Sequence, residues 1–182
     1  MNQETEIRIL EIKQEEWIAK LEEIGAILEG NWLQKRKVYD FHPVIENKWI
    51  RLRTNGKTTT LAIKEITDEN IASGTNELEI EVSDFEKTAQ ILEELGYHYR
   101  SLEENKRIRY RYNNIEIDID TWPLIPTYVE IEAPTEKEIT DFLKNFTFDK
   151  GKITTLGVQS VYEKVYHIPF DFKVLTFESQ IK

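Results

Sequence analysis

The chain has 182 residues, 40% of them hydrophobic, and a net charge of −10. This length and apolar content predict one domain with a substantial core, and the lack of cysteine excludes disulfides and thiolate metal sites. The acidic balance argues against general nucleic-acid binding, which depends on surplus Lys and Arg. Only three histidines occur, so any metal would be bound by oxygen. The first residues lack the basic and apolar runs of a secretory signal, so we expect a cytoplasmic protein without a membrane partner.

Two stretches carry apolar side chains at helical spacing and end near a glycine, which predicts amphipathic helices over residues 15–28 and 84–95. Matching LEEIG of the first helix with LEELG of the second also places Tyr39 on Tyr110 without a gap. This correspondence predicts two related strand-helix-strand units. Further helices are predicted over residues 135–146, where Thr135 and Glu138 form a capping box, and over residues 155–166.

Seven segments alternate polar with apolar residues, which is the period of a β-strand. Each has an ionic face and an apolar face, and helices can cover the apolar faces only from outside the sheet. We therefore predict an α+β fold in which an antiparallel sheet closes into a β-tunnel around its ionic faces, with the domain spanning residues 1–170 and a C-terminal tail over residues 171–182. The alternative is a plain structural domain whose ionic faces meet water. The segments are ETEIRI, WIRLRT, TLAIK, ELEIEV, RIRYRY, IEIDID and YVEIE.

The sequence Asn113-Asn114 is a candidate two-residue hairpin turn between two alternating runs. This turn would set three basic residues directly opposite three acidic ones on the neighbouring strand. We therefore expect Arg109 and Arg111 to be ion-pair partners rather than phosphate ligands. The predicted pairs are Arg111 with Glu116, Arg109 with Asp118, and Arg107 with Asp120.

An interior lined by charge is costly unless the charges pair, stay hydrated or bind a ligand. Arg and Lys side chains offer hydrogen-bond donors suited to phosphate oxygens, and carboxylates offer hard ligands for magnesium or manganese. Phosphoryl chemistry uses both kinds of group. The pattern therefore favours a metal-dependent site for phosphoryl chemistry.

These motifs resemble the CYTH superfamily, also called triphosphate tunnel metalloenzymes, over residues 4–166. The ExExK motif of that family appears here as ETEIR, with Arg8 in the place of the family's lysine. The resemblance implies an eight-stranded antiparallel tunnel that binds Mg²⁺ or Mn²⁺ and a triphosphate. The other matching pieces follow in the family's order: RLR at 51–53, Lys64, ELEIE at 77–81, Arg107, Asp120 and YVEIE at 128–132.

By this resemblance the basic residues would hold the triphosphate and the acidic residues the metal, with Lys64 and Arg107 also as the candidate catalytic groups. Asp120 and the glutamates of residues 77–81 could instead neutralise neighbouring basic groups. Tyr39 could support Lys64 as a base, or could pack in the core. The implied substrate ligands are Arg8, Arg51, Arg53, Lys64 and Arg107, and the implied metal ligands are Glu4, Glu6, Glu130, Glu132, Asp120 and Glu79.

Three functions stay open at this point. The first is hydrolysis of inorganic triphosphate (tripolyphosphate) or of a triphosphate such as ATP or thiamine triphosphate. The second is the conversion of ATP to cyclic AMP and pyrophosphate by a class IV-type adenylate cyclase. The third is a non-catalytic module that binds polyphosphate or a nucleotide, although the pair Glu4 and Glu6 argues against it. The sequence also leaves a homodimer open.

Overall fold

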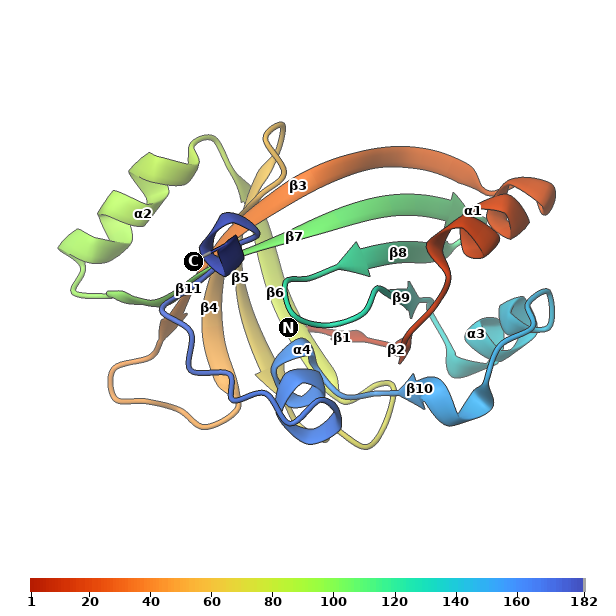
Figure 1. Ribbon diagram of the computed structural model, residues 1–182. Helices are drawn as coiled ribbons and strands as arrows, with labels where there is room; N and C mark the ends of the chain where they lie inside the picture. The colour runs from red at the N-terminus through yellow and green to blue at the C-terminus, as the bar shows by residue number, and fades with distance from the viewer. Residues whose placement is uncertain (182) are drawn as a thin grey trace.

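Within residues 1–181, which the computed structural model describes, eleven strands form one sheet that curls strongly into a half-barrel (Figure 1). The strand order is β1-β6-β5-β4-β3-β7-β8-β9-β2-β10, and the short β11 lies parallel to β7. All other neighbours are antiparallel. The strands are β1 (Asn2–Glu4), β2 (Glu6–Ile9), β3 (Ile27–Asp40), β4 (Lys48–Thr54), β5 (Thr59–Ile66), β6 (Thr75–Val82), β7 (Tyr99–Tyr112), β8 (Ile115–Thr121), β9 (Tyr128–Glu132), β10 (Ile153–Thr154) and β11 (Val174–Leu175).

Three helices pack on the outer face of the sheet, and α4 lies at one end of the curl (Figure 1). The predicted fourth helix divides into α4 and a π-helical turn, and the predicted third helix ends at Leu143 rather than near Phe146. The helices are α1 (Gln14–Glu23), α2 (Phe85–Glu94), α3 (Glu136–Leu143), α4 (Val158–Ser160) and the π-helix Val161–Val165, with short 3₁₀ turns at Lys150–Lys152 and Glu178–Ile181.

The ends of the helices follow local side-chain chemistry. Gly25 adopts a φ of 81°, which costs glycine little, and β3 starts two residues later. Leu28 therefore belongs to a strand and not to the helix that its apolar spacing predicted. The side chain of Asp84 accepts a hydrogen bond from the backbone N–H of Lys87 at the start of α2. Thr135 caps α3 in the predicted way, because its hydroxyl accepts a hydrogen bond from the N–H of Glu138.

The predicted internal repeat is present in the fold. Helix α2 begins and ends 71 residues after α1. Each helix follows one strand and precedes a long one, so the order is β2-α1-β3 in the first unit and β6-α2-β7 in the second. The long strands β3 and β7 pair with each other, and Gln34 lies directly opposite Asn105, its own counterpart in the repeat. The two units therefore contact each other through β3 and β7, with Gln34 and Asn105 at the centre of the contact.

The prediction of a closed, eight-stranded tunnel is wrong in closure and in strand number. The hydrogen-bonded ladder is open, with β1 at one end and β10 at the other. Strands β1 and β2 are separated only by Thr5, yet β1 pairs with β6 and β2 pairs with β9. Because the N-terminal strand is broken at Thr5, its first half pairs with β6 and its second half with β9, and no continuous ladder of hydrogen bonds closes the sheet. Alternating patterns indicate a sheet but carry no information about such a break.

The outward apolar side chains form the core, as the alternation predicts. Leu21 of α1 and Phe142 of α3 pack on a cluster that includes Ile117 of β8, and Leu92 of α2 packs on a second cluster that includes Leu52 of β4. Among the described residues, none of the helices has the length and apolar character needed to span a bilayer.

Part of the segment predicted to be a tail contributes to the packing. Strand β11 pairs with β7, and Leu175 is fully buried in a third cluster with Tyr162. Lys182 lies outside the described residues, and the domain boundary at residue 170 stays a prediction.

Leu21 is fully buried on the face of α1 that packs on the sheet, so truncation of its side chain should destabilise the fold. We expect Leu21→Ala to cost about 2–5 kcal/mol through lost burial and a residual cavity, and to lower the melting temperature by about 5–15 °C. The matched control is Leu95→Ala, because Leu95 is 68% exposed. Equal melting temperatures for the two variants would contradict this account of the core.

Candidate functional site

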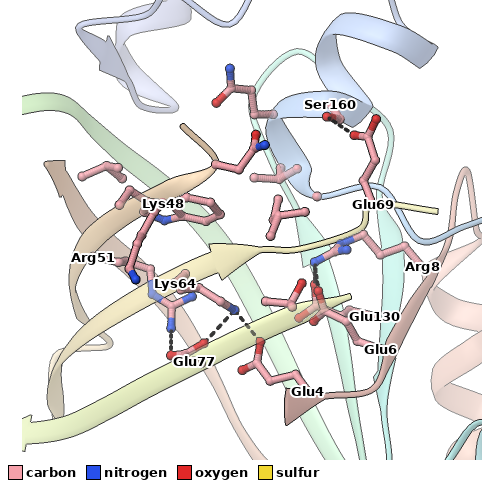
Figure 2. Close-up of a pocket in the computed structure, with 18 of the residues that line it drawn as sticks. Glu4, Glu6, Arg8, Lys48, Arg51, Lys64, Glu69, Glu77, Glu130 and Ser160 are labelled. Atoms are coloured by element: carbon pink, nitrogen blue, oxygen red, sulfur yellow. Dashed lines mark hydrogen bonds and ion pairs between the residues drawn. The ribbon is translucent and has the colours of Figure 1, made fainter. Parts of the chain in front are cut away.

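The inner face of the sheet encloses a cavity of about 1070 Å³ whose walls carry mainly charged side chains. Because side chains alternate along each strand, the charged positions of the alternating segments point inward while their apolar neighbours pack outward. Figure 2 shows Arg51, Lys64, Glu77 and Glu130 converging in this space. All the sequence-predicted site residues line it: Glu4, Glu6, Arg8, Arg51, Arg53, Lys64, Glu79, Arg107, Asp120, Glu130 and Glu132.

Strands β3, β4 and β5 form a basic wall made of Arg36, Arg51, Arg53 and Lys64. Arg36 and Arg53 are direct neighbours across β3 and β4, a like-charge pairing that normally destabilises a sheet. Burial first, and then the nearby guanidinium groups, led by that of Arg51, lower the pKa of Arg53 to about 9. Burial likewise lowers the pKa of Arg36 to about 10. This part of the wall has more positive charge than its neighbours neutralise.

Arg36 is a site residue that the sequence did not reveal. Its face of β3 is polar, but the opposite face carries Lys35 and Lys37, so no alternation marks it. No described carboxylate makes an ion pair with Arg36; it donates hydrogen bonds to the side chains of Asn105 and Gln34 instead. Its guanidinium carbon lies 4.5 Å from the ring centroid of Trp122, which orients the group toward the cavity.

The other three residues of the basic wall contact acidic residues of β6 and β1, with Arg53 contacting Glu79 at 3.4 Å. Arg51 contacts Glu77 at 2.7 Å and Glu79 at 3.0 Å, and Lys64 bridges Glu77 at 2.7 Å and Glu4 at 2.8 Å (Figure 2). Although burial by itself would raise the pKa of Glu77, Arg51 and Lys64 hold it well below its ordinary value. Glu77 and Glu79 are therefore neutralising partners of the cations in this structure.

Strands β2, β8 and β9 form an acidic wall. Glu132 lies between Glu6 on one neighbouring strand and Glu116 on the other. Burial, together with the charges of Glu116 and Glu6, raises the pKa of Glu132 to about 7. Burial also raises the pKa of Glu4 to about 8, although Lys64 opposes the shift. This wall has more negative charge than its neighbours neutralise.

The predicted hairpin register is confirmed, and it explains how Arg107 is held. Residues 107, 109 and 111 face 120, 118 and 116. Arg107 donates to both carboxylate oxygens of Asp120, at 2.8 and 2.5 Å, and contacts Glu130 at 3.2 Å and Asp118. Asp120 is completely buried in this contact. The structure therefore places Asp120 in an ion pair, which is one of its two predicted roles.

Tyr39 lies on the other face of the sheet from Lys64. It is completely buried in the cluster under α2, with its ring edge-on to Tyr99 at 6.3 Å. Burial raises its pKa to about 12. Of its two predicted roles, core packing is the one that this geometry supports.

The acidic wall suits a hard divalent cation in chemistry but does not form a ready-made centre. Among residues 1–181, no three His, Cys, Asp or Glu side chains are grouped closely enough to hold a metal ion. The reason lies in the ion pairs, because Arg8 and Arg107 contact Glu130 while Lys64 contacts Glu4. Within the described part of the chain Glu132 has no such partner, and a cation would offset both the burial and the neighbouring negative charges that raise its pKa.

The family model of the CYTH domain matches residues 2–158. The chain belongs to the CYTH domain family. No curated protein matches its sequence.

Solved structures share the CYTH fold over most of the chain. A Pyrococcus horikoshii protein has a TM-score of 0.72 and 22% identity, covering 84% of this chain and 94% of its own. A candidate adenylate cyclase of Vibrio parahaemolyticus has a TM-score of 0.75 and 11% identity, covering 89% and 98%. A Hippeastrum protein, described as an adenylyl cyclase candidate with a dominant triphosphatase activity, has a TM-score of 0.60 and 15% identity, covering 92% and 97%.

The raised pKa of Glu132 predicts a pH-dependent stability. Between the ordinary pKa of a glutamate and about 7, the folded state holds a proton that the unfolded chain releases, so this group's contribution to stability falls as pH rises through that window. We expect Glu132→Gln to melt about 2–4 °C above the wild type at pH 8, for a relief of about 1 kcal/mol, and to match it near pH 4.5.

The measurement is a thermal melt in metal-free buffer at both pH values. The control is Glu15→Gln, which changes an exposed glutamate of α1 and should leave the pH dependence unaltered. A Glu132→Gln variant that is less stable than the wild type at pH 8 would show that the carboxylate is neutralised in the fold.

Proposed function

We propose that this CYTH domain is a divalent-metal-dependent enzyme that binds a triphosphate in its cavity and hydrolyses it. The observation that carries the proposal is the cross-strand pair of Arg36, which is buried, and Arg53, which is half-buried; both line the cavity wall and have lowered pKa values. Two neighbouring cations whose one carboxylate contact is that of Arg53 with Glu79, at 3.4 Å among the described residues, form a site for a multiply charged anion. The activity in the description of the Hippeastrum protein supports hydrolysis as the reaction.

In this proposal the basic wall binds the phosphate chain. Arg36 makes no ion pair among the described residues, and Arg53 contacts one carboxylate, that of Glu79 at 3.4 Å, so both can bind phosphate oxygens. Arg51 and Lys64 can exchange contacts with Glu77 for contacts with the ligand. Lys64 links the basic wall to the N-terminal strand, because it contacts Glu4 of β1 as well as Glu77 of β6. Lys64 and Arg107 are the groups that would stabilise charge on the transferred phosphoryl group, Arg107 after exchanging its contact with Glu130 for one with the ligand.

Glu4, Glu6, Glu130 and Glu132 are the residues that would hold Mg²⁺ or Mn²⁺. When bound, such an ion neutralises phosphate oxygens and favours attack by water. The raised pKa values of Glu4 and Glu132 describe carboxylates that keep a proton until a cation replaces it. The two walls thus match the two parts of a metal triphosphate.

Cyclisation of ATP is the second candidate, and one feature of the cavity favours it. Trp49 shares the inward face of β4 with Arg51, and it lines the cavity with Val44 and Ile45. An aromatic and aliphatic surface beside the basic wall has room for the organic part of a nucleotide. The same phosphate contacts would serve either reaction.

Turnover distinguishes these functions. We expect purified protein with Mg²⁺ or Mn²⁺ to release phosphate from tripolyphosphate, ATP or thiamine triphosphate. If ATP instead gives cyclic AMP and pyrophosphate, the reaction is cyclisation and not hydrolysis. Binding of all three compounds without product would identify a binding module and refute the enzymatic proposal.

Arg53→Gln should separate binding from stability. Loss of one cation from a buried like-charge pair should raise the melting temperature of the free protein and weaken tripolyphosphate binding by about tenfold or more. Calorimetry in metal-free buffer measures the binding. The matched control is Lys35→Gln, which removes the same charge from an exposed position on β3. A lower melting temperature with unchanged affinity would make Arg53 a structural ion-pair residue.

A further inference from the structure

Arg8 is held differently from the cations of the basic wall. It lies on β2 with 7% of its surface exposed. Its NH2 group contacts Glu6 at 2.9 Å and Glu130 at 2.5 Å, and its NH1 group donates a hydrogen bond to the backbone carbonyl of Leu156 at 2.9 Å (Figure 2). Both ends of the guanidinium fork are therefore engaged within the protein.

The carbonyl of Leu156 belongs to the C-terminal segment, which we define as residues 153–175. This segment begins as β10, whose Thr154 pairs with Arg8, and continues through α4 and the π-helix to β11 (Figure 1). Its residues 157–160 form part of the cavity wall. The position of this segment therefore sets the shape of the cavity at that end.

Glu69 provides a second attachment for the same segment. Its carboxylate accepts a hydrogen bond from the hydroxyl of Ser160 at 3.2 Å and pairs with Lys164, and its backbone carbonyl accepts a hydrogen bond from Thr155 at 2.7 Å. Arg8 and Glu69 thus contact the segment from β2 and from the loop between β5 and β6. Only Arg8 also contacts the acidic wall.

We propose that Arg8 is a positioning residue, which fastens the C-terminal segment to the acidic wall, and that it does not bind the triphosphate. The second part rests on the proposed function, and the first part does not. A guanidinium presents separated nitrogens that can serve carboxylates on one side and a carbonyl on the other, whereas the lysine of the family motif has a single nitrogen. Arg8, in the place of the family's lysine, therefore adds a hydrogen bond to the C-terminal segment that a lysine bound to the same carboxylates would lack.

The charge balance around Arg8 agrees with this role. Arg8 contacts two carboxylates, those of Glu6 at 2.9 Å and Glu130 at 2.5 Å. Among the described residues, Arg36 makes no ion pair, and Arg53 makes one, with Glu79 at 3.4 Å. The charge of Arg8 is therefore neutralised by its protein partners more fully than that of Arg36 or Arg53.

Two readouts on Arg8→Lys test the proposal, both in metal-free buffer. Hydrogen exchange of the amides of residues 156–166 should quicken by about tenfold, because a charge-assisted hydrogen bond to the segment is lost. The affinity for tripolyphosphate, measured by calorimetry, should change by less than about threefold. Arg53→Lys is the matched control and should show the reverse, with weaker binding and unchanged exchange.

Unchanged exchange in Arg8→Lys would overturn the positioning role. A loss of tripolyphosphate affinity equal to that of Arg53→Lys would overturn the second part of the proposal. The ligand would then reach Arg8 through Nε, which is buried without a hydrogen-bond partner among the described residues. If the wild type binds no tripolyphosphate, the proposed function fails, and the exchange measurement still decides the positioning role.

A charge-balanced variant covers the case in which Arg8→Lys does not fold. Arg8→Gln combined with Glu6→Gln removes one positive and one negative charge, so the buried site stays balanced. We expect the same quickening of exchange in residues 156–166 as in Arg8→Lys. Exchange equal to that of the wild type in this double variant would refute the attachment.

Discussion

Most charges on the inner face of this sheet are buried opposite a charge of the other sign, and that pairing allows the sheet to curl around an ionic interior. Arg107 is the fullest example, since it contacts Asp118, Asp120 and Glu130 together. Two places depart from this rule: Arg36 lies beside Arg53, and Glu132 lies between two other glutamates. The surplus charges have opposite signs and lie on different walls. A triphosphate with a divalent cation would compensate both.

The internal repeat relates the two walls, which differ in sign. Tyr39 and Tyr110 are counterparts in the repeat, and they face Ile50 and Ile117 on the next strands. The residues that follow these isoleucines are therefore counterparts too, so that Arg51 corresponds to Asp118 and Arg53 to Asp120. The same correspondence continues to the strands after these, where Lys64 of β5 matches Glu132 of β9. The inward charge is therefore reversed between β4 and β8 and between β5 and β9, whereas Arg36 and Arg107, counterparts on β3 and β7, are both basic.

Surplus charge lowers stability, so other contacts must hold the walls in place. The outer core under α1, α2 and α3 is apolar and independent of the inner charges. The C-terminal segment adds a third cluster, in which Tyr162 packs edge-on to Trp122 while Trp122 stacks on Arg36. Its attachments at Arg8 and Glu69 connect the same segment to the acidic wall and to the loop before β6. The segment therefore contacts groups on both sides of the cavity.

On the strands that alternate, the sequence alone determined which residues share a face, because a period of two assigns neighbouring side chains to opposite faces. The hairpin register of Arg107, Arg109 and Arg111, and with it the pairing of Arg107 with Asp120, followed from a two-residue turn. The tertiary structure decided the rest. The open ladder depends on a break at Thr5, and Glu130 contacts both Arg8 and Arg107 because β9 lies between β2 and β8. Arg36 was hidden because both faces of β3 carry charge. Strands β1 and β2 pair with strands far apart in the chain, and local periodicity has no information about which strands become neighbours.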